Sequence, residues 1–359
     1  MAPPTSTSLA SSALSRRALL RGMIAGAGVG ALGCRRGRAL ALYNWGDYLA
    51  PEVVERFLES QAGATLTQDF YLSEAELGAK LRAGAAYDLC VPIDYQLSGL
   101  QRDGVLLELR AEPKGAHHLA PEFPIWSARA TRGGGKYAIP YLWGTTGIGY
   151  DSERVDPAPT SWNALFDARY GGRISVIDSK GDVMDQGLLA SGLGINSIDK
   201  AAIRERVYPR LREQKKLLRG YDSNPAAALI NGDTWIAQID SGDLLRAQAM
   251  RPSLRYLVPE EGAAVWTDYL AIPDKARDPQ LALRFIEFLL DPEIAALNAN
   301  TLRYATPNAT ALERGLIADA HDRQIYPDPE LRERLFTSED WDGNTKLLVD
   351  ELWLELRAS

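Results

Sequence analysis

Histidine and cysteine are among the scarcest side chains in this sequence of 359 residues. Histidine occurs three times, as His117, His118 and His321, and cysteine twice, as Cys34 and Cys90. So few imidazoles leave few candidates for a catalytic triad. The G-x-S-x-G pattern of a nucleophile elbow does not occur either. We therefore expect neither an enzyme nor a bound cofactor or metal ion.

Basic side chains are fewer than acidic ones. Residues 1–33 contain three of the 40 basic residues and none of the 47 acidic ones, so the remainder carries 37 basic and 47 acidic side chains, a net charge of −10. A nucleic-acid partner would favour a basic patch, and this balance argues against one. The acidity is compatible with a cationic ligand, although most acidic proteins are simply solvated in this way.

The apolar run near the N-terminus, Met23 to Leu32, is too short to cross a bilayer, which takes about 20 residues. It follows Ser15-Arg-Arg-Ala-Leu-Leu-Arg21, a twin-arginine pattern, and it ends at Ala31-Leu-Gly-Cys34, which resembles a lipobox. We interpret residues 1–33 as a twin-arginine, lipoprotein-type export signal. We expect a lipid on Cys34 and a periplasmic or otherwise extracytoplasmic location.

A lipid on Cys34 would leave Cys90 without a disulfide partner, so no disulfide is expected. Cys90 stands in the short apolar stretch Asp88-Leu-Cys-Val-Pro92. Free cysteine behaves as a small hydrophobic residue. We predict that Cys90 is a buried core residue.

Strand and helix patterns alternate along the rest of the chain, which predicts an α/β protein whose sheets are mixed, mainly parallel and flanked by helices. The expected strands are residues 39–43, 65–71, 87–91, 105–109, 173–177, 234–239, 254–258 and 266–273. Three of the expected helices start at Pro51, at the capping box of Ser73 and at Ser161, and a fourth follows the strand 87–91 and ends at Asp103. The other expected helices are residues 183–193, 203–211, 244–250, 281–290, 293–300 and 345–357.

Residues 137–151 form the centre of this organisation. They begin with the alternation of a strand, and Gly144, Gly147 and Gly149 then remove Cβ atoms where a backbone passes close to another group. Trp143 is expected to be exposed in a cleft. A core strand with glycines for packing is the alternative. Because new strands and helices follow Asp151, we interpret the segment as the crossing between two lobes.

Acidic and aromatic residues gather where strands are predicted to end. In an open parallel sheet, ligands bind outside the carboxyl ends of the strands. An amine would be held there by carboxylates and by aromatic faces. One such acid is more often a helix cap than a ligand group, but five groups across both lobes favour a site for an amphiphilic cation. These groups are residues 44–48, 94–95, 178–182, 240 and 266–268.

Other local patterns favour structural roles. His117-His118 is flanked by prolines and a glycine, which is typical of a surface loop rather than a metal half-site. Gly133-Gly-Gly-Lys136 lacks the spacing of a phosphate-binding loop, and a hairpin turn is the better interpretation. Paired carboxylates could also hydrolyse glycosides, and nothing in the residues separates that function from cation binding.

The sequence resembles the periplasmic spermidine/putrescine-binding proteins, the solute-binding components of ABC transporters. The matching segments follow the family order over nearly the whole chain after the signal. They are residues 43–48 (YNWGDY), 87–92 (YDLCVP), 139–144 (IPYLWG) with 147–149 (GIG), 224–225 (NP), 266–273 (WTDYLAIP) and 306–308 (TPN). The resemblance implies two α/β lobes joined by a hinge, with the ligand between them and a membrane permease as partner.

The resemblance also implies boundaries and site residues. The first lobe would comprise residues 39–144 and 268–312, and the second residues 145–267 and 313–359, in a monomer. Asp268 would bind an amine while Trp266 stacks on the methylenes, and Asp182 would act from the second lobe. The other implied cleft residues are Trp45, Asp47, Tyr48, Tyr95, Tyr304 and Asp342.

Two departures from the family pattern concern the ligand. Where relatives carry Ile-Trp-Asn-Gly this chain has Ile239-Asp-Ser-Gly242, so that Asp240 replaces an aromatic wall and is counted among the site residues. Relatives often carry an acid at the position of Ser179, whose role the neighbouring Asp178 could take. Polyamines such as putrescine or spermidine remain the expected ligands. The alternatives are another compact cation, such as an amino acid derivative or opine-like compound, an extracellular enzyme, or an iron-binding protein, which would need an adjacent Tyr-Tyr pair.

Overall fold

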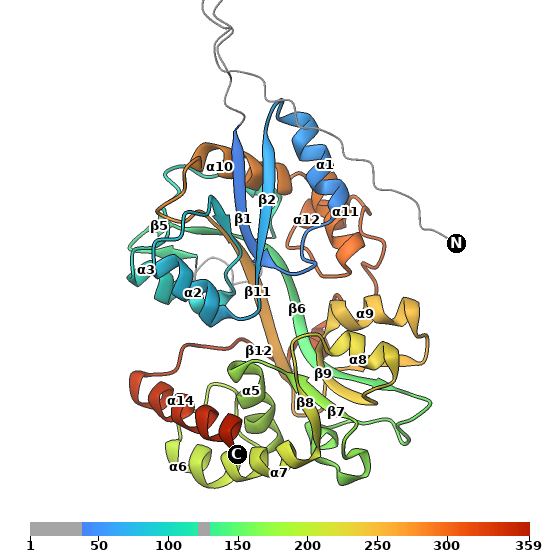
Figure 1. Cartoon of the computed structure of the whole chain (residues 1–359). Coiled ribbons are helices and arrows are strands. Elements are labelled where there is room, and N and C mark those ends of the chain that lie inside the picture. The colour runs from blue at the N-terminus through green and yellow to red at the C-terminus, as the bar shows by residue number, and fades with distance from the viewer. Residues whose placement is uncertain (1–37, 121–129) are drawn as a thin grey trace, which may run out of the picture. The chain divides into compact units, whose positions relative to one another are not determined.

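The structure is a computed structural model that describes residues 38–120 and 130–359. The predicted export signal and Cys34 lie outside these residues. The described part forms a ten-stranded mixed sheet in the order β2-β1-β3-β11-β6-β9-β7-β8, with β10 paired to β6 and β12 paired to β11 (Figure 1). Its strands are β1 (Ala39–Trp45), β2 (Thr65–Tyr71), β3 (Leu89–Cys90), β6 (Ala138–Asp151), β7 (Ile174–Ile177), β8 (Leu218–Asp222), β9 (Ile236–Asp240), β10 (Leu254–Leu257), β11 (Ala263–Ala271) and β12 (Leu335–Phe336).

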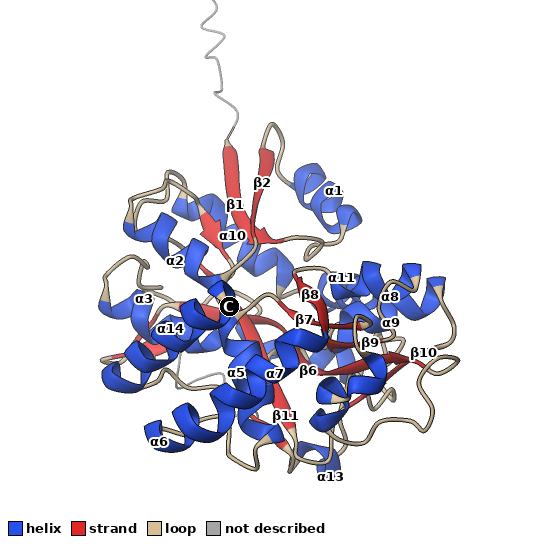
Figure 2. Cartoon of the chain, turned by 60° about the horizontal axis from the view of Figure 1, so that its bottom comes forward, coloured by secondary structure: helices blue, strands red, loops and turns tan. Residues whose placement is uncertain are grey.

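Helices flank this sheet (Figure 2). The α-helices are α1 (Pro51–Ser60), α2 (Glu74–Arg82), α3 (Asp94–Arg102), α5 (Lys180–Ala190), α6 (Lys200–Ala202), α7 (Tyr208–Leu217), α8 (Pro225–Asn231), α9 (Ser241–Met250), α10 (Pro279–Leu289), α11 (Pro292–Leu302), α12 (Ala309–Glu313), α13 (Pro329–Arg332) and α14 (Gly343–Ala358). Three 3-10 helices, η1 (Ala116–His118), η2 (Trp162–Phe166) and η3 (Ala168–Tyr170), and the π-helical turn η4 (Ile203–Val207) complete the helical elements of the described residues. None of the described helices is long and apolar enough to cross a membrane.

The sheet has a parallel group of strands at each end and antiparallel strands between them. β1 runs parallel to β2 and β3, and β7 runs parallel to β8 and β9. β6 is antiparallel to its neighbours β11 and β9. This arrangement confirms the predicted fold class at the level of a two-lobed α/β protein with a mixed sheet and flanking helices. We call the part around β1–β3 and α1–α3 the first lobe, and the part around β7–β9, α5 and α14 the second.

Each lobe has its own hydrophobic core. In the first, Phe57 of α1 meets Phe285 of α10 with ring centroids 4.6 Å apart, beneath the strands of β1 and β3. In the second, apolar side chains of β7, α5, α7 and α14 pack together, and Leu348, Leu352 and Leu356 form the buried face of α14, as their spacing predicts.

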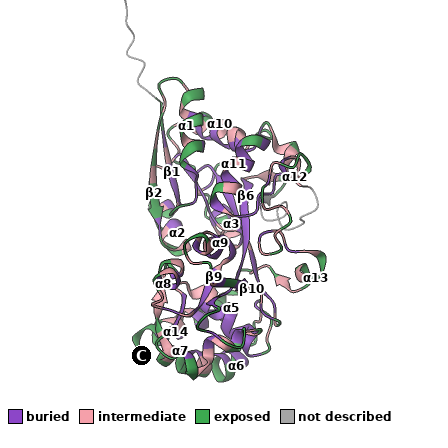
Figure 3. Ribbon diagram, turned by 90° about the vertical axis from the view of Figure 1, so that its right-hand side faces the viewer, coloured by how far each residue is buried: buried purple, intermediate pink, exposed green. Residues whose placement is uncertain are grey.

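The central strand β6 joins the two cores. All 14 of its residues are buried, and Figure 3 shows it passing through both lobes. Ile139 and Leu142 belong to the first core, and Ile148 and Tyr150 to the second. β6 therefore passes from one lobe into the other, as predicted for residues 137–151. The expectation of an exposed Trp143 is wrong: its ring is 3% exposed, because the neighbouring loops and β11 cover it.

Other local predictions have mixed outcomes. Cys90 is buried, as predicted, and forms no disulfide among the described residues. The predicted hairpin turn is also confirmed, because Gly133 and Gly134 connect β4 (Thr131–Arg132) to β5 (Gly135–Lys136). Residues 105–109 are not a strand, because only single bridges at Leu106 and Leu109 connect them to neighbours. Residues 161–166 form a 3-10 helix rather than an α-helix. Strand β8 has no counterpart among the predicted strands. Its residues do not alternate between buried and exposed positions.

The glycines of β6 are required by close packing, which a substitution can test. A Cβ atom at Gly147 would lie 2.4 Å from the backbone oxygen of Leu257 and 2.7 Å from the hydroxyl of Tyr256. We expect Gly147→Ala to lower the free energy of unfolding by about 1–3 kcal/mol, the usual cost of overpacking, as measured by urea denaturation. Gly220→Ala on β8 is the control, because its Cβ would enter open space. Equal, small losses in both variants would contradict this account.

Candidate functional site

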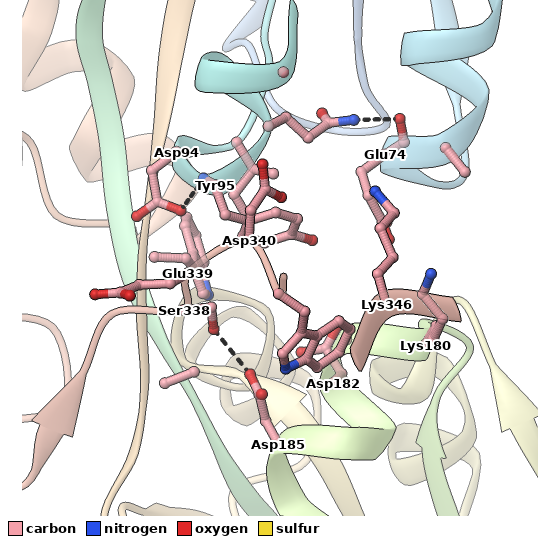
Figure 4. A pocket seen from close by; sticks show the side chains of 18 of the residues that line it. Glu74, Asp94, Tyr95, Lys180, Asp182, Asp185, Ser338, Glu339, Asp340 and Lys346 are labelled. Carbon is pink, nitrogen blue, oxygen red and sulfur yellow. Dashed lines mark hydrogen bonds between the residues drawn. The ribbon is translucent and has the colours of Figure 1, made fainter. Parts of the chain in front are cut away.

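A cavity of about 410 Å3 lies between the two lobes, a volume within the range of small-molecule sites. Its walls come from α2 and α3 of the first lobe, α5 of the second, β11, and the segment that precedes α14 (Figure 4). The polar and aromatic lining residues are Glu74, Arg82, Asp94, Tyr95, Gln96, Arg102, Asp103, Thr146, Lys180, Asp182, Asp185, Asn196, Trp266, Ser338, Glu339, Asp340, Trp341 and Lys346.

Acids outnumber bases in this lining by seven to four, and ion pairs engage most of the bases. Arg82 pairs with Asp103 at 2.7 Å, and Arg102 of α3 pairs at 3.6 Å with Asp340 of the segment that precedes α14. Lys180 pairs with an acid on α14. By contrast, Asp182 and Asp185 take part in no ion pair among the described residues. The cavity therefore favours a positively charged ligand.

Helix α5 presents two carboxyl groups to the cavity. Ser179 caps the helix by accepting a hydrogen bond from the backbone N–H of Asp182, and Asp185 follows one turn later on the same face. Asp185 accepts a hydrogen bond from Ser338 at 3.0 Å, which Figure 4 shows. Burial raises the pKa of Asp182 to about 6. Burial and the nearby charge of Asp182 raise the pKa of Asp185 to about 8.

Strand β11 presents Trp266 and Asp268 on one face, because they lie two residues apart. Trp266 lines the cavity, and Asp268 lies behind it with 4% of its surface exposed. The pairing of β11 with β6 shifts between Asp268 and Tyr269, opposite Pro140, which has no N–H to contribute to the ladder. Desolvation raises the pKa of Asp268 to about 8.

Three polar atoms around Asp268 lack hydrogen-bond partners among the described residues. They are the Asp268 Oδ1, the Trp45 Nε1 and the Tyr48 hydroxyl, all inaccessible to water. Trp45 and Tyr48 approach Asp268 closely enough to favour its ionised form, yet no hydrogen bond of normal geometry joins them. A buried polar group without a partner costs about 1–3 kcal/mol. The Asp268 Oδ1 could therefore accept a hydrogen bond from a ligand that supplies donors.

Asp240 and Tyr304 are held by other residues of the protein. The Asp240 Oδ1 accepts hydrogen bonds from the Thr146 hydroxyl at 2.6 Å and from the Trp266 Nε1 at 3.1 Å. The Tyr304 hydroxyl donates to Asp243 at 2.8 Å, and its ring meets that of Trp266 edge-on, with centroids 5.3 Å apart.

The structure thus distributes the predicted site residues over three environments. Tyr95, Asp182 and Trp266 line the cavity. The second group lies beside or behind it: Tyr48, Asp268 and Tyr304 are buried, and Trp45 and Asp240 are half-buried. Asp47 and Asp342 lie outside the lining. Asp47 occupies an exposed turn with a φ of +52°, and Asp342 caps α14 by accepting hydrogen bonds from Asn344 and Thr345.

The sequence interpretation missed Asp185 and Glu74. Asp185 could have been found from its spacing, because it stands three residues after Asp182 on a predicted helix. Asp178 does not replace the acid expected at Ser179, since it pairs with Arg357 at 2.6 Å and is absent from the lining. His117 and His118 lie on η1, and no group of metal-ligating side chains occurs in the described part of the chain.

Comparisons with known proteins agree with this architecture. Residues 52–324 match the family model described as bacterial extracellular solute-binding protein. The spermidine/putrescine-binding periplasmic protein of Salmonella typhimurium is 29% identical, with 96% of this chain and 98% of the relative covered. The putrescine/cadaverine-binding protein of Pseudomonas aeruginosa is 29% identical, with 89% and 93% covered. A putative spermidine/putrescine ABC transporter structure from Listeria monocytogenes superimposes with a TM-score of 0.81 at 29% identity, covering 89% of this chain and 99% of that one.

The raised pKa of Asp185 predicts how stability depends on pH. The ordinary pKa of this group is 3.8, and burial raises it to about 8 in the folded chain, so the folded chain binds more protons than the unfolded chain between these pH values. The free energy of unfolding of the unliganded protein should therefore fall as the pH rises from about 4 to about 8. Asp185→Asn should make this slope shallower in urea denaturation at a series of pH values.

Glu213→Gln is the matched control for this measurement, because Glu213 is exposed on α7. It should leave the slope of stability against pH unchanged. A slope in Asp185→Asn equal to that of the unsubstituted protein would show that Asp185 is ionised at neutral pH.

Proposed function

The chain belongs to the bacterial extracellular solute-binding proteins, and on that premise we propose that it captures putrescine- or spermidine-like polyamines and delivers them to an ABC permease. It is a binding protein and not an enzyme. The relatives named above for spermidine, putrescine or cadaverine support this ligand class. The observation that carries the proposal is the buried carboxyl group of Asp268, whose Oδ1 accepts no hydrogen bond of normal geometry from the described residues, although Trp45 and Tyr48 lie near it.

An alkyl diamine would meet carboxyl groups near both of its ends. Asp268 lies behind the cavity wall, as Asp240 does, but its Oδ1 accepts no hydrogen bond of normal geometry from the described residues. One ammonium group would donate to Asp268, and the other would approach Asp182 and Asp185 on α5. Charge-assisted hydrogen bonds of this kind are stronger than neutral ones. The methylenes between the two amines would lie against Trp266, with Tyr95 and Trp341 among the other aromatic lining residues.

Closure of the two lobes would bury such a ligand. The acids that we assign to it come from β11 and from α5 of the second lobe, and Arg102 of α3 pairs with Asp340 of the segment that precedes α14. Binding favours the closed state only through contacts that the open state lacks. For the lobes we propose residues 39–144 with 268–312, and 145–267 with 313–359. A twin-arginine export signal in residues 1–33, lipidation of Cys34 and a monomeric state complete the proposal.

A second candidate ligand carries a carboxylate in addition to an amine. Lys346 lines the edge of the cavity and forms no ion pair among the described residues, so it could bind such a group. Asp240, the residue that first suggested a different ligand, gives this candidate less support, because its Oδ1 already accepts two hydrogen bonds. The ligands 4-aminobutyrate and arginine represent this class in the experiment below.

The role of Asp268 can be tested by calorimetric titration of residues 35–359 with putrescine, spermidine, 4-aminobutyrate and arginine. We expect polyamines to bind more tightly than the two amino acids. Asp268→Asn keeps the volume of the side chain but removes its charge, and it should weaken polyamine binding about 10- to 100-fold, the usual value of a hydrogen bond to a charged group.

Asp274→Asn serves as the control for Asp268→Asn. Asp274 follows the same strand, is exposed and pairs with its neighbour Lys275, so its substitution should leave affinity unchanged. An affinity of Asp268→Asn within twofold of the unsubstituted protein would refute the assigned role. Tight binding of the amino acids without polyamine binding would instead favour the second candidate.

A further inference from the structure

Asp240 stands at the end of β9, where it faces the central strands rather than the cavity. It is paired in register with Thr146 on β6, and its side chain reaches the edge of the Trp266 indole. Asp240 is not among the cavity-lining residues, whereas both of its donors, Thr146 and Trp266, are. The carboxyl group therefore lies behind the wall that a ligand would touch.

The Trp266 ring is held from three directions. On one side Gly144 leaves room for it, because a Cβ there would lie 2.7 Å from the Cζ2 of the indole. The ring of Tyr304 meets it edge-on. Asp240 accepts its only polar hydrogen at 3.1 Å. Packing limits where the ring can lie, and the hydrogen bond selects one orientation of the indole within that space.

We propose that Asp240 is a positioning residue: it fixes the indole of Trp266 and thereby sets the affinity of the cavity for its amine ligand. The affinity part of this inference rests on the proposed function. The Thr146 hydroxyl, at 2.6 Å, holds the same Oδ1 in place, so that the acceptor is itself oriented. Asp240 then acts on the ligand through Trp266 and not by direct contact with an ammonium group.

This role makes a prediction that requires no ligand. The indole N–H signals of the eight tryptophans can be recorded by NMR, and the signal lost in Trp266→Phe identifies Trp266. Asp240→Ala should shift that signal, because the indole loses its acceptor. Asp240→Asn keeps an acceptor oxygen and should return the signal toward its original position. An unchanged Trp266 signal in Asp240→Ala would overturn the proposal.

A double-mutant cycle on putrescine affinity tests whether Asp240 acts through Trp266. Asp240→Ala should weaken binding about tenfold, as expected for the loss of one hydrogen bond, and Asp240→Asn should restore most of the affinity. In the Trp266→Phe background, which has no N–H to orient, Asp240→Ala should have no further effect. Losses that multiply in the double variant, or Asp240→Asn as weak as Asp240→Ala, would show that Asp240 contacts the ligand directly.

Asp222→Asn is the matched control. Asp222 also ends a strand of the same sheet, but its Oδ1 accepts a hydrogen bond from the backbone N–H of Asn224 and not from a tryptophan. It should alter neither the Trp266 signal nor the affinity. If the unsubstituted protein binds no amine, the proposed function fails, while the NMR result still decides whether Asp240 positions Trp266. If Asp240→Ala does not fold, Asp240→Asn is compared with the unsubstituted residue instead, once with Trp266 present and once in Trp266→Phe. A large loss of putrescine affinity in Asp240→Asn would then contradict the proposal.

Discussion

The site depends on one physical constraint, the free-energy cost of ionising a carboxyl group that is buried away from water. Asp268 and Asp185 are buried without a cation among the described residues, and each therefore titrates well above the usual range. A buried charge is costly unless it is paired. The unliganded protein avoids the cost by keeping these groups protonated near neutral pH. A ligand that brings ammonium groups would stabilise the ionised forms and so be bound selectively.

The strands that cross between the lobes hold these groups in place. β6 and β11 belong to both lobes, and Gly144 of β6 allows Trp266 to lie directly against the backbone of its neighbour. The shift in register beside Asp268 follows from Pro140, which cannot donate to the ladder. α5 brings its acids from the second lobe, so the cavity is complete only when both lobes contribute. The same long strands are the natural place for a hinge.

Patterns local in sequence predicted the fold well, and contacts distant in sequence limited the prediction of the site. Periodicity located α14 and β2, and the proline at its first position located α1, since these signals depend on neighbours along the chain. The resemblance placed Tyr95, Asp182 and Trp266 on the cavity wall. It could not show that Trp143 is covered, because residues from four separate segments, at positions 245, 265, 305 and 325, bury it. Nor could it show that Asp240 is engaged by Thr146 and Trp266, which lie 94 and 26 residues away in sequence.

Proton release on ligand binding tests the central claim most directly. Calorimetric titration with putrescine near pH 7, in buffers of different ionisation enthalpy, gives the number of protons exchanged per ligand. The account predicts that binding releases protons, because carboxyl groups with a pKa of about 8 become ionised beside the amines, and that the release declines at pH values well above 8. Binding without any proton release near pH 7 would show that these groups are already ionised, and would contradict the account.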